Sequence, residues 1–170
     1  IKSIADSSGK IFLSPAYRLI KDRKHFILTP LKKSATHELL IYKKNKCYKE
    51  GELRIETEIT DNNDVAVHHN EKNKALLDCS QLLFPLKFRK WKRGDYFFPL
   101  GMQGRKKVSD FFIDQKISVP EKEKIWILES DGKIVWGACH RIDERFKIRE
   151  KTKTIFQIKI NMINEISDNK

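Results

Sequence analysis

The sequence of 170 residues lacks a long hydrophobic run, which argues against a membrane-spanning helix. Such a helix needs about 20 consecutive apolar residues, and no segment approaches that length. No secretory signal opens the chain, since no basic segment followed by an apolar one is found there. We therefore expect a cytoplasmic protein with no membrane partner. The first residue, Ile1 rather than Met, suggests a piece of a longer protein.

Cysteine is scarce, and its spacing excludes the common zinc-binding patterns. A zinc knuckle needs closely spaced pairs, whereas the three cysteines here are odd in number and far apart. They are Cys47, Cys79 and Cys139. A site that joins Cys139 and His140 to His68 or His69 is an alternative, but packing or surface exposure is the simpler interpretation of each histidine. We expect reduced thiols and no metal.

Catalytic signatures are missing as well. No Gly-rich phosphate loop follows a predicted strand, and no Ser-His-Asp or Cys-His set is identifiable from residue order. The GxxG spacing at 101–104 can clamp a nucleic-acid backbone in a KH domain, but here Pro99 and aromatic residues precede it. A plain turn is the simpler interpretation, and a turn whose amides approach phosphate is a third. We expect no catalytic residues in this chain.

Positive charge is what the sequence has in excess. Lys and Arg total 35 against 23 Asp and Glu, so the net charge is +12 and the isoelectric point is about 9.6. A surplus of this size is an argument about partners, and it favours a polyanion such as nucleic acid. An anionic membrane surface is the alternative.

Residues 1–84 are predicted to be rich in β structure. Strict alternation of apolar and charged residues over 52–59 is typical of a half-buried strand. The Asn and Asp cluster at 61–64 predicts a turn, because these side chains bond their own backbone. The remaining short strands are expected at residues 11–13, 25–29, 39–42, 65–68 and 75–78.

Two short helices and further strands are predicted after Pro85. Val108, Phe111, Phe112 and Gln115 fall at i, i+3, i+4 and i+7, a spacing that puts the apolar side chains on one face of a helix, and Ser118 with Glu121 forms a capping box for a second one. The pair Asp131-Gly132 indicates a hairpin turn. Strands are expected at residues 86–88, 125–128, 134–136 and 156–160.

Two basic clusters are the candidates for contact with RNA. Lys and Arg side chains neutralise phosphates, and arginine also forms bidentate bonds. Solvated faces of a basic protein are the alternative interpretation, and the interleaved aromatics do not decide it, because Phe97 or Phe98 must be core if this segment is a strand. The candidates are Arg89, Lys90, Lys92, Arg93, Arg105, Lys106, Lys107, Arg141, Arg145 and Lys147.

Separated motifs in one order identify a resemblance. The run RKWKRGDYFFPLGMQGRKKVSDFFIDQKI at 89–117 and the run DGKIVWGACHRIDERFKI at 131–148 resemble the C-terminal domain of bacterial tRNA(Ile)-lysidine synthetase. The shared elements are Arg89, Gly94-Asp95, Pro99 and Gly101, the run from Lys106 to Phe112, the run 134–136 and the run from Arg141 to Arg145. A departure is Ala138-Cys139-His140, where the family more often has Gly before the Arg.

The resemblance implies a role without chemistry of its own. Enzymes of that family convert the wobble cytidine of an isoleucine tRNA to lysidine with ATP, Mg and free lysine. That chemistry belongs to an N-terminal ATP-pyrophosphatase domain with a Ser-Gly-Gly-x-Asp-Ser loop, which these residues lack. The C-terminal domain is implied to contact the acceptor-stem side of the tRNA. It also resembles a module of the phenylalanyl-tRNA synthetase β subunit.

We therefore predict an α+β, predominantly β fold: a small β-barrel-like C-terminal domain with two short helices at 85–162, preceded by a β-rich segment at 1–84 and followed by a polar tail at 163–170. The alternative function is a module that docks on the catalytic domain or forms a homodimer. Asp95 and Asp110 are expected to hold the basic loop through ion pairs or caps. The expected core includes Trp91, Phe111, Phe112 and Trp136.

Overall fold

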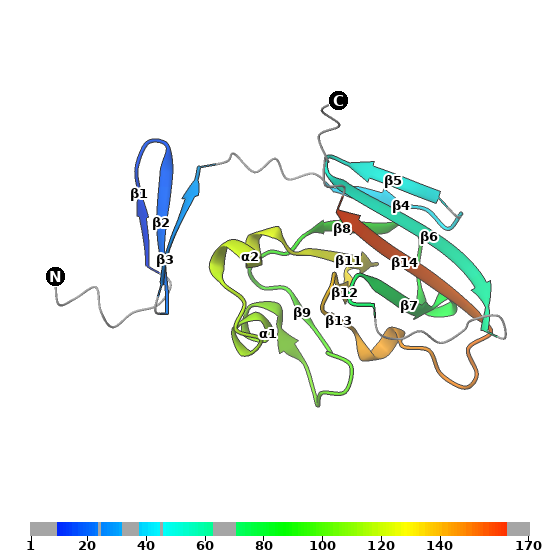
Figure 1. The fold of residues 1–170 in the computed structure, drawn as a ribbon. Helices are drawn as coiled ribbons and strands as arrows, with labels where there is room; N and C mark the ends of the chain where they lie inside the picture. Colours follow the sequence, from blue (N-terminus) through cyan, green and yellow to red (C-terminus); the bar gives the residue numbers. More distant parts are fainter. Residues whose placement is uncertain (1–9, 24, 32–37, 45, 63–70, 163–170) are drawn as a thin grey trace, which may run out of the picture.

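Two antiparallel sheets form most of the computed structural model, which describes residues 10–23, 25–31, 38–44, 46–62 and 71–162 (Figure 1). The five-stranded sheet has the order β13 (Arg141–Ile142), β12 (Lys133–Gly137), β11 (Trp126–Ser130), β8 (Leu86–Lys90) and β4 (Leu39–Ile41). The four-stranded sheet has the order β5 (Lys46–Glu50), β6 (Leu53–Asp61), β14 (Thr154–Met162) and β7 (Lys74–Asp78).

The main core lies between these two sheets. On β14, Phe156, Ile158 and Ile160 are buried, whereas the alternating Gln157 and Lys159 are half-buried. From the five-stranded sheet, one apolar face contributes to the same cluster, which includes Phe88, Leu128 and Trp136. The period of two predicted for 52–59 and 156–160 is thus confirmed, since each strand has one face against the core.

A second core covers the other face of the five-stranded sheet. Helix α1 (Val108–Asp114) buries Phe111 and Phe112 against Ile127 and Ile134. Successive residues of a strand point to opposite faces, so Ile127 and its neighbour Leu128 belong to different cores. Trp91 is half-buried, with its ring 5.3 Å from that of Phe112. Helix α1 therefore forms a third layer.

Local signals in the sequence explain the boundaries of several elements. Helix α2 (Val119–Lys124) begins after Ser118, whose backbone amide and hydroxyl both donate to the Glu121 carboxylate, at 2.9 and 2.6 Å. The turn between β11 and β12 has positive φ at Asp131 (46°) and Gly132 (73°), as a tight two-residue hairpin turn requires. Both predictions are confirmed.

A separate three-stranded sheet precedes these layers in the chain. It has the order β1 (Ile11–Leu13), β2 (Tyr17–Asp22) and β3 (His25–Pro30). Arg18 on β2 forms an ion pair with Glu123 of α2 and donates to the Thr29 hydroxyl at 2.9 Å. Several apolar side chains of this sheet are exposed, among them Leu13 (73%) and Leu28 (64%).

The predicted fold class is confirmed, with a difference in detail. The structure is mainly β with two short helices, but the two large sheets pack face to face and end in open edges instead of closing into a barrel. The structure also shows strands that were not predicted: β2, β5, β13 and a pair of two-residue strands at 96–97 and 106–107. The strand expected at 65–68 and the polar tail at 163–170 lie outside the described residues.

Segments on both sides of residue 85 share the large sheets. Strand β4 pairs with β8, and β6 and β7 both pair with β14. The division into residues 1–84 and 85–162 stays a prediction. In the described part of the chain, the helices are too short and too polar to cross a membrane.

Substitution of Phe112 by Ala tests the second core. Phe112 is 1% exposed, so removal of its ring is expected to lower the free energy of unfolding by about 3–5 kcal/mol. Urea unfolding followed by tryptophan fluorescence measures this change. Ile113→Ala is the matched control, because Ile113 is the next residue of the same helix and is 61% exposed. A loss below about 1 kcal/mol for Phe112→Ala would contradict the assignment.

Candidate nucleic-acid interface

Strand β9 (Tyr96–Phe97) and the residues that follow it bring the two predicted basic clusters together. A bridge joins Pro99 to Asp143, the Leu100 amide donates to the Ile142 carbonyl at 3.0 Å, and the Glu144 amide donates to the Phe98 carbonyl at 2.7 Å. Residues 141–147 therefore lie beside residues 96–100, although more than 40 residues separate them in the sequence. Sequence reasoning named both clusters but had no evidence that they are adjacent.

The ribbon of β9 and β10 (Lys106–Lys107) has an inner and an outer face. Phe97 is 2% exposed and belongs to the second core, whereas Tyr96 is 46% exposed. In the antiparallel register Lys106 pairs with Phe97 and Lys107 pairs with Tyr96, so each pair shares a face. Lys106 forms an ion pair with Asp114 of α1. Lys107 is exposed and lies on the outer face with Tyr96.

Two arginines stack on aromatic rings of this ribbon. The Arg105 guanidinium lies 4.7 Å from the centre of the Tyr96 ring. The Arg145 guanidinium lies 4.6 Å from the centre of the Phe98 ring. Tyr96 and Phe98 are two residues apart, which places both side chains on the side opposite to Phe97. Aromatic and cationic groups thus form one outward-facing cluster.

The buried carboxylate of Asp143 holds this cluster in place. Asp143 is 0% exposed. It accepts hydrogen bonds from the Phe98 amide at 2.9 Å and from the Arg145 side chain at 2.9 and 2.8 Å, and the Arg145 amide donates to it as well. The hydrogen bond to Asp143 raises the pKa of Arg145, so this side chain is cationic at every physiological pH. Sequence reasoning missed Asp143, and its place in the Asp-x-Arg spacing was the available signal.

Arg89 is an internal residue of the fold. It is 7% exposed, and its guanidinium forms two 2.9 Å bonds to Asp95 and one of 2.8 Å to Glu129. Burial acts to lower the pKa of Arg89, but the bonds to the two carboxylates outweigh it and raise the pKa overall. Asp95 also accepts from the Lys92 amide at 2.7 Å, so the expectation that Asp95 holds the basic loop is confirmed. Arg89 is therefore unavailable to an outside partner.

Lys90, the next residue of β8, lies on the opposite side of the strand from Arg89. Its ammonium donates to the Lys124 carbonyl at 2.6 Å and lies 4.4 Å from the centre of the Trp126 ring. Burial, with a smaller effect of the nearby Lys124 charge, lowers the pKa of Lys90 to about 8. This lysine thus packs along the protein surface and belongs to the neighbourhood of α2.

The other candidates differ in whether an acidic side chain pairs with their charge. Lys147 forms an ion pair with Glu144, and Arg141 donates to the Leu100 carbonyl at 3.0 Å. Among the residues that the structure describes, no acidic partner is found for five exposed cations of this region. These are Lys92, Arg93, Arg105, Lys107 and Arg141. The Asp95 carbonyl accepts from the Val108 amide at 2.9 Å, which ties the loop of Lys92 and Arg93 to the end of β10. Asp110 lies in the first turn of α1 and accepts from Ser109.

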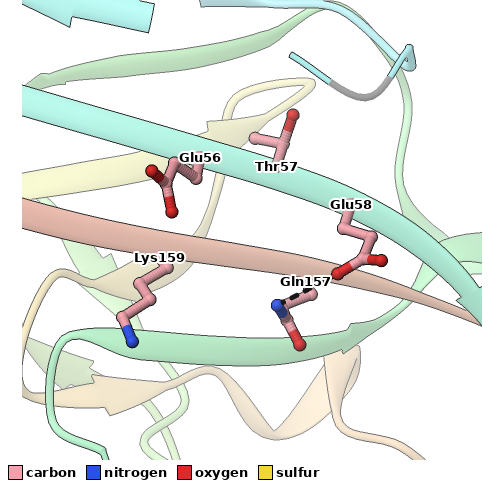
Figure 2. A pocket seen from close by; sticks show the side chains of 5 residues that line it. All are labelled: Glu56, Thr57, Glu58, Gln157 and Lys159. Carbon is pink, nitrogen blue, oxygen red and sulfur yellow. Dashed lines mark hydrogen bonds between the residues drawn. The ribbon is translucent and has the colours of Figure 1, made fainter. Parts of the chain in front are cut away.

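The outer face of the four-stranded sheet has a different character. A shallow hollow of about 280 Å³ is lined by Glu56, Glu58, Gln157 and Lys159, together with Thr57 (Figure 2). Gln157 donates to Glu58 at 3.4 Å. The two carboxylates at this hollow repel phosphate, so it is not a candidate for RNA contact.

A metal centre finds no support in the described residues. Within them, no group of three His, Cys, Asp or Glu side chains has the geometry to hold an ion. All three cysteines are free. The alternative site at Cys139 and His140 depends on His68 or His69, which lie outside the described part of the chain.

Comparison with known proteins identifies the family. Residues 1–31 match the model described as TilS substrate binding domain, and residues 86–160 match the one described as TilS substrate C-terminal domain. Together these matches cover more than half of the chain. The chain belongs to the tRNA(Ile)-lysidine synthase family. The resemblance found in the motifs at 89–117 and 131–148 is confirmed.

Individual members of the tRNA(Ile)-lysidine synthase family extend the match to nearly the whole chain. The synthase of Parabacteroides distasonis is 40% identical over 90% of this chain, and that of Bacteroides thetaiotaomicron is 35% identical over 94%. The chain covers 35% and 36% of these two proteins, so it spans about a third of their length. A solved structure described as a TILS C-terminal domain matches with a TM-score of 0.63 and 19% identity. It covers 75% of this chain and 99% of its own, which supports the fold.

Substitution of Arg89 by Met tests its internal role. The change leaves Asp95 and Glu129 without their shared cation, and we expect the free energy of unfolding to fall by about 3–5 kcal/mol. Arg93→Met, at an exposed arginine of the same loop, is expected to change it by less than about 0.5 kcal/mol. Urea denaturation of both variants checks this. Equal effects of the two substitutions would contradict the internal role of Arg89.

The pH dependence of stability tests the environment of Lys90. Its pKa is about 8 in the folded chain and 10.5 in its ordinary state, so between these values the unfolded chain binds a proton that the folded chain does not. Stability then rises with pH across this window. We expect the unfolding free energy of the wild type to increase from pH 8 to pH 10.5 relative to Lys90→Met. The assignment is wrong if the unfolding free energies of the wild type and Lys90→Met change equally with pH. It is also wrong if Lys92→Met differs from the wild type in the same way as Lys90→Met.

Proposed function

We propose that this chain is a non-catalytic, tRNA-contacting portion of a tRNA(Ile)-lysidine synthase. The observation that carries the proposal is that two distant basic clusters meet at β9 and include five exposed cations without acidic partners in the described residues. The basic surface of the proposal consists of Lys92, Arg93, Arg105, Lys107 and Arg141. Lys106, Arg145 and Lys147 lie next to it in ion pairs, while Arg89 and Lys90 take no part.

The shape and charge of this surface suit a structured RNA. Lys and Arg neutralise phosphates and release counterions, which supplies affinity that falls steeply with salt. Double-stranded RNA is contacted mainly through its backbone and shape, because its deep major groove does not admit side chains. We infer that the acceptor-stem side of an isoleucine tRNA is the partner, as the family resemblance implies.

The chemistry of the longer protein is part of the same proposal. We infer that it converts the wobble cytidine to lysidine with ATP, Mg and free lysine, and that an ATP-pyrophosphatase domain outside this chain performs the reaction. The support is family membership together with a chain that spans about a third of its relatives. The same reasoning favours action in the cytoplasm.

A docking role is the second candidate. One face of the sheet of β1, β2 and β3 exposes Phe12, Phe26 and Leu28, at 40%, 55% and 64%. Exposed apolar groups in one small sheet favour contact with another protein surface. On this hypothesis the chain docks on the catalytic domain or forms a homodimer, and it makes no direct contact with RNA.

Charge reversal separates the two candidates. In filter binding at low salt, Arg93→Glu with Lys107→Glu is expected to weaken tRNA binding at least about tenfold and to reduce the slope of log affinity against log salt by about two. The control is Lys49→Glu with Lys133→Glu, which makes the same change in net charge at exposed lysines outside the basic surface.

Three results would count against RNA contact through this surface. One is no measurable tRNA binding by the wild-type chain at low salt. Another is an equal loss of affinity in the control, which would show a general charge effect. The third is unchanged tRNA binding with an altered oligomeric state by sedimentation, which would favour the docking role.

A further inference from the structure

We propose that Tyr96, Phe98, Arg105 and Arg145 form a stacking site for an unpaired nucleobase. The inference rests on the proposed function, because it names the part of the RNA that this cluster recognises. It goes further, because phosphate contact requires only cations, whereas here two guanidinium groups lie over two aromatic rings. Bases that are not covered in a helix stack on aromatic rings and on guanidinium planes.

Arg145 presents a flat surface that is fixed in advance. Its edge is held by two bonds to the buried Asp143, at 2.9 and 2.8 Å, and its centre lies 4.6 Å from the centre of the Phe98 ring and 5.7 Å from that of the Phe146 ring. The side chain is still 35% exposed, and this exposed part is what a partner can reach. Since the group is already ordered, little conformational freedom is lost when a base stacks on it.

Arg105 and Tyr96 extend this surface along the ribbon. Tyr96 is 46% exposed, and Arg105 is exposed with no carboxylate partner among the described residues. Tyr96 and Phe98 are two residues apart, so the two arginine–ring pairs are neighbours along the chain. Lys107 lies opposite Tyr96 on the same face, where its ammonium can meet the phosphate of the stacked nucleotide.

Aromatic rings that lie beside cationic side chains favour an unpaired nucleotide over a duplex. Inside a helix both faces of a base are covered by its neighbours, so only an end or a single strand offers a free face. A duplex would bind the charges of Arg105 and Lys107 through its phosphates, but it would not stack on the aromatic rings. Arg145 adds little net charge, since its cation is matched by Asp143. We therefore assign the cluster to an unpaired residue beside a stem.

The test compares two synthetic RNA stem-loops with the 170-residue chain. One has a blunt stem, and the other has the same stem with an unpaired four-nucleotide 3′ extension that carries 2-aminopurine. We expect the extended RNA to bind about tenfold more tightly, with a change in 2-aminopurine fluorescence that reports stacking. Tyr96→Leu is expected to remove the preference and the fluorescence change, while binding of the blunt stem changes by less than about twofold and the salt slope is unchanged.

Tyr17→Leu is the matched control, because Tyr17 is 49% exposed and lies in the separate sheet of β1 to β3. It is expected to leave both RNAs unaffected. If Tyr96→Leu lowers the melting temperature, Arg105→Met at an exposed side chain replaces it, with the same loss of preference and a salt slope lower by about one.

The outcomes distinguish this inference from the proposed function. If the wild-type chain binds the blunt and the extended RNA with equal affinity and without a fluorescence change, the stacking site is overturned, while RNA contact still stands. An equal loss for both RNAs in Tyr96→Leu also overturns it, because the ring would then act only in the fold. Failure of both RNAs to bind overturns the proposed function together with the inference.

Discussion

A carboxylate that is closed off from solvent is stable only if other groups satisfy its charge and its lone pairs, and Asp143 satisfies both within the protein. Its partners are the Phe98 amide and the Arg145 backbone and side chain, so residues near β9 and residues 141–147 have one relative position. The pair of Arg89 and Asp95 does the same for the loop before β9. The basic surface depends on these two buried acids.

The cations near β9 differ in their burial and in their ion-pair partners. Arg89 is enclosed and bonded to carboxylates, so it holds the fold together. Arg145 is bonded to Asp143 and lies over the Phe98 ring, but 35% of its side chain stays exposed. Lys92, Arg93 and Lys107 are exposed, without acidic partners in the described part of the chain. Charge alone treats all five alike, but only the exposed ones can exchange counterions for phosphate.

Much of the fold was predictable because its signals are local. The alternation on β14, the turn at Asp131-Gly132 and the cap at Ser118 depend on residues a few positions apart, and the structure confirms each. Strands β2 and β5 were missed, since their sequences YRLIKD and KCYKE lack a clear apolar alternation. Pairing with neighbouring strands stabilises them, and that pairing is not visible in a short window.

By itself, the sequence determined the family, the surplus of positive charge and most of the strands and helices, because composition and local spacing carry that information. Only the tertiary structure decided which cations are available. Arg89 and Arg93 are alike in the sequence, yet one is 7% exposed and bonded to two acids while the other is exposed. The reason is physical: burial and ion pairing depend on long-range contacts, such as Arg89 with Glu129, that arise only when the strands come together.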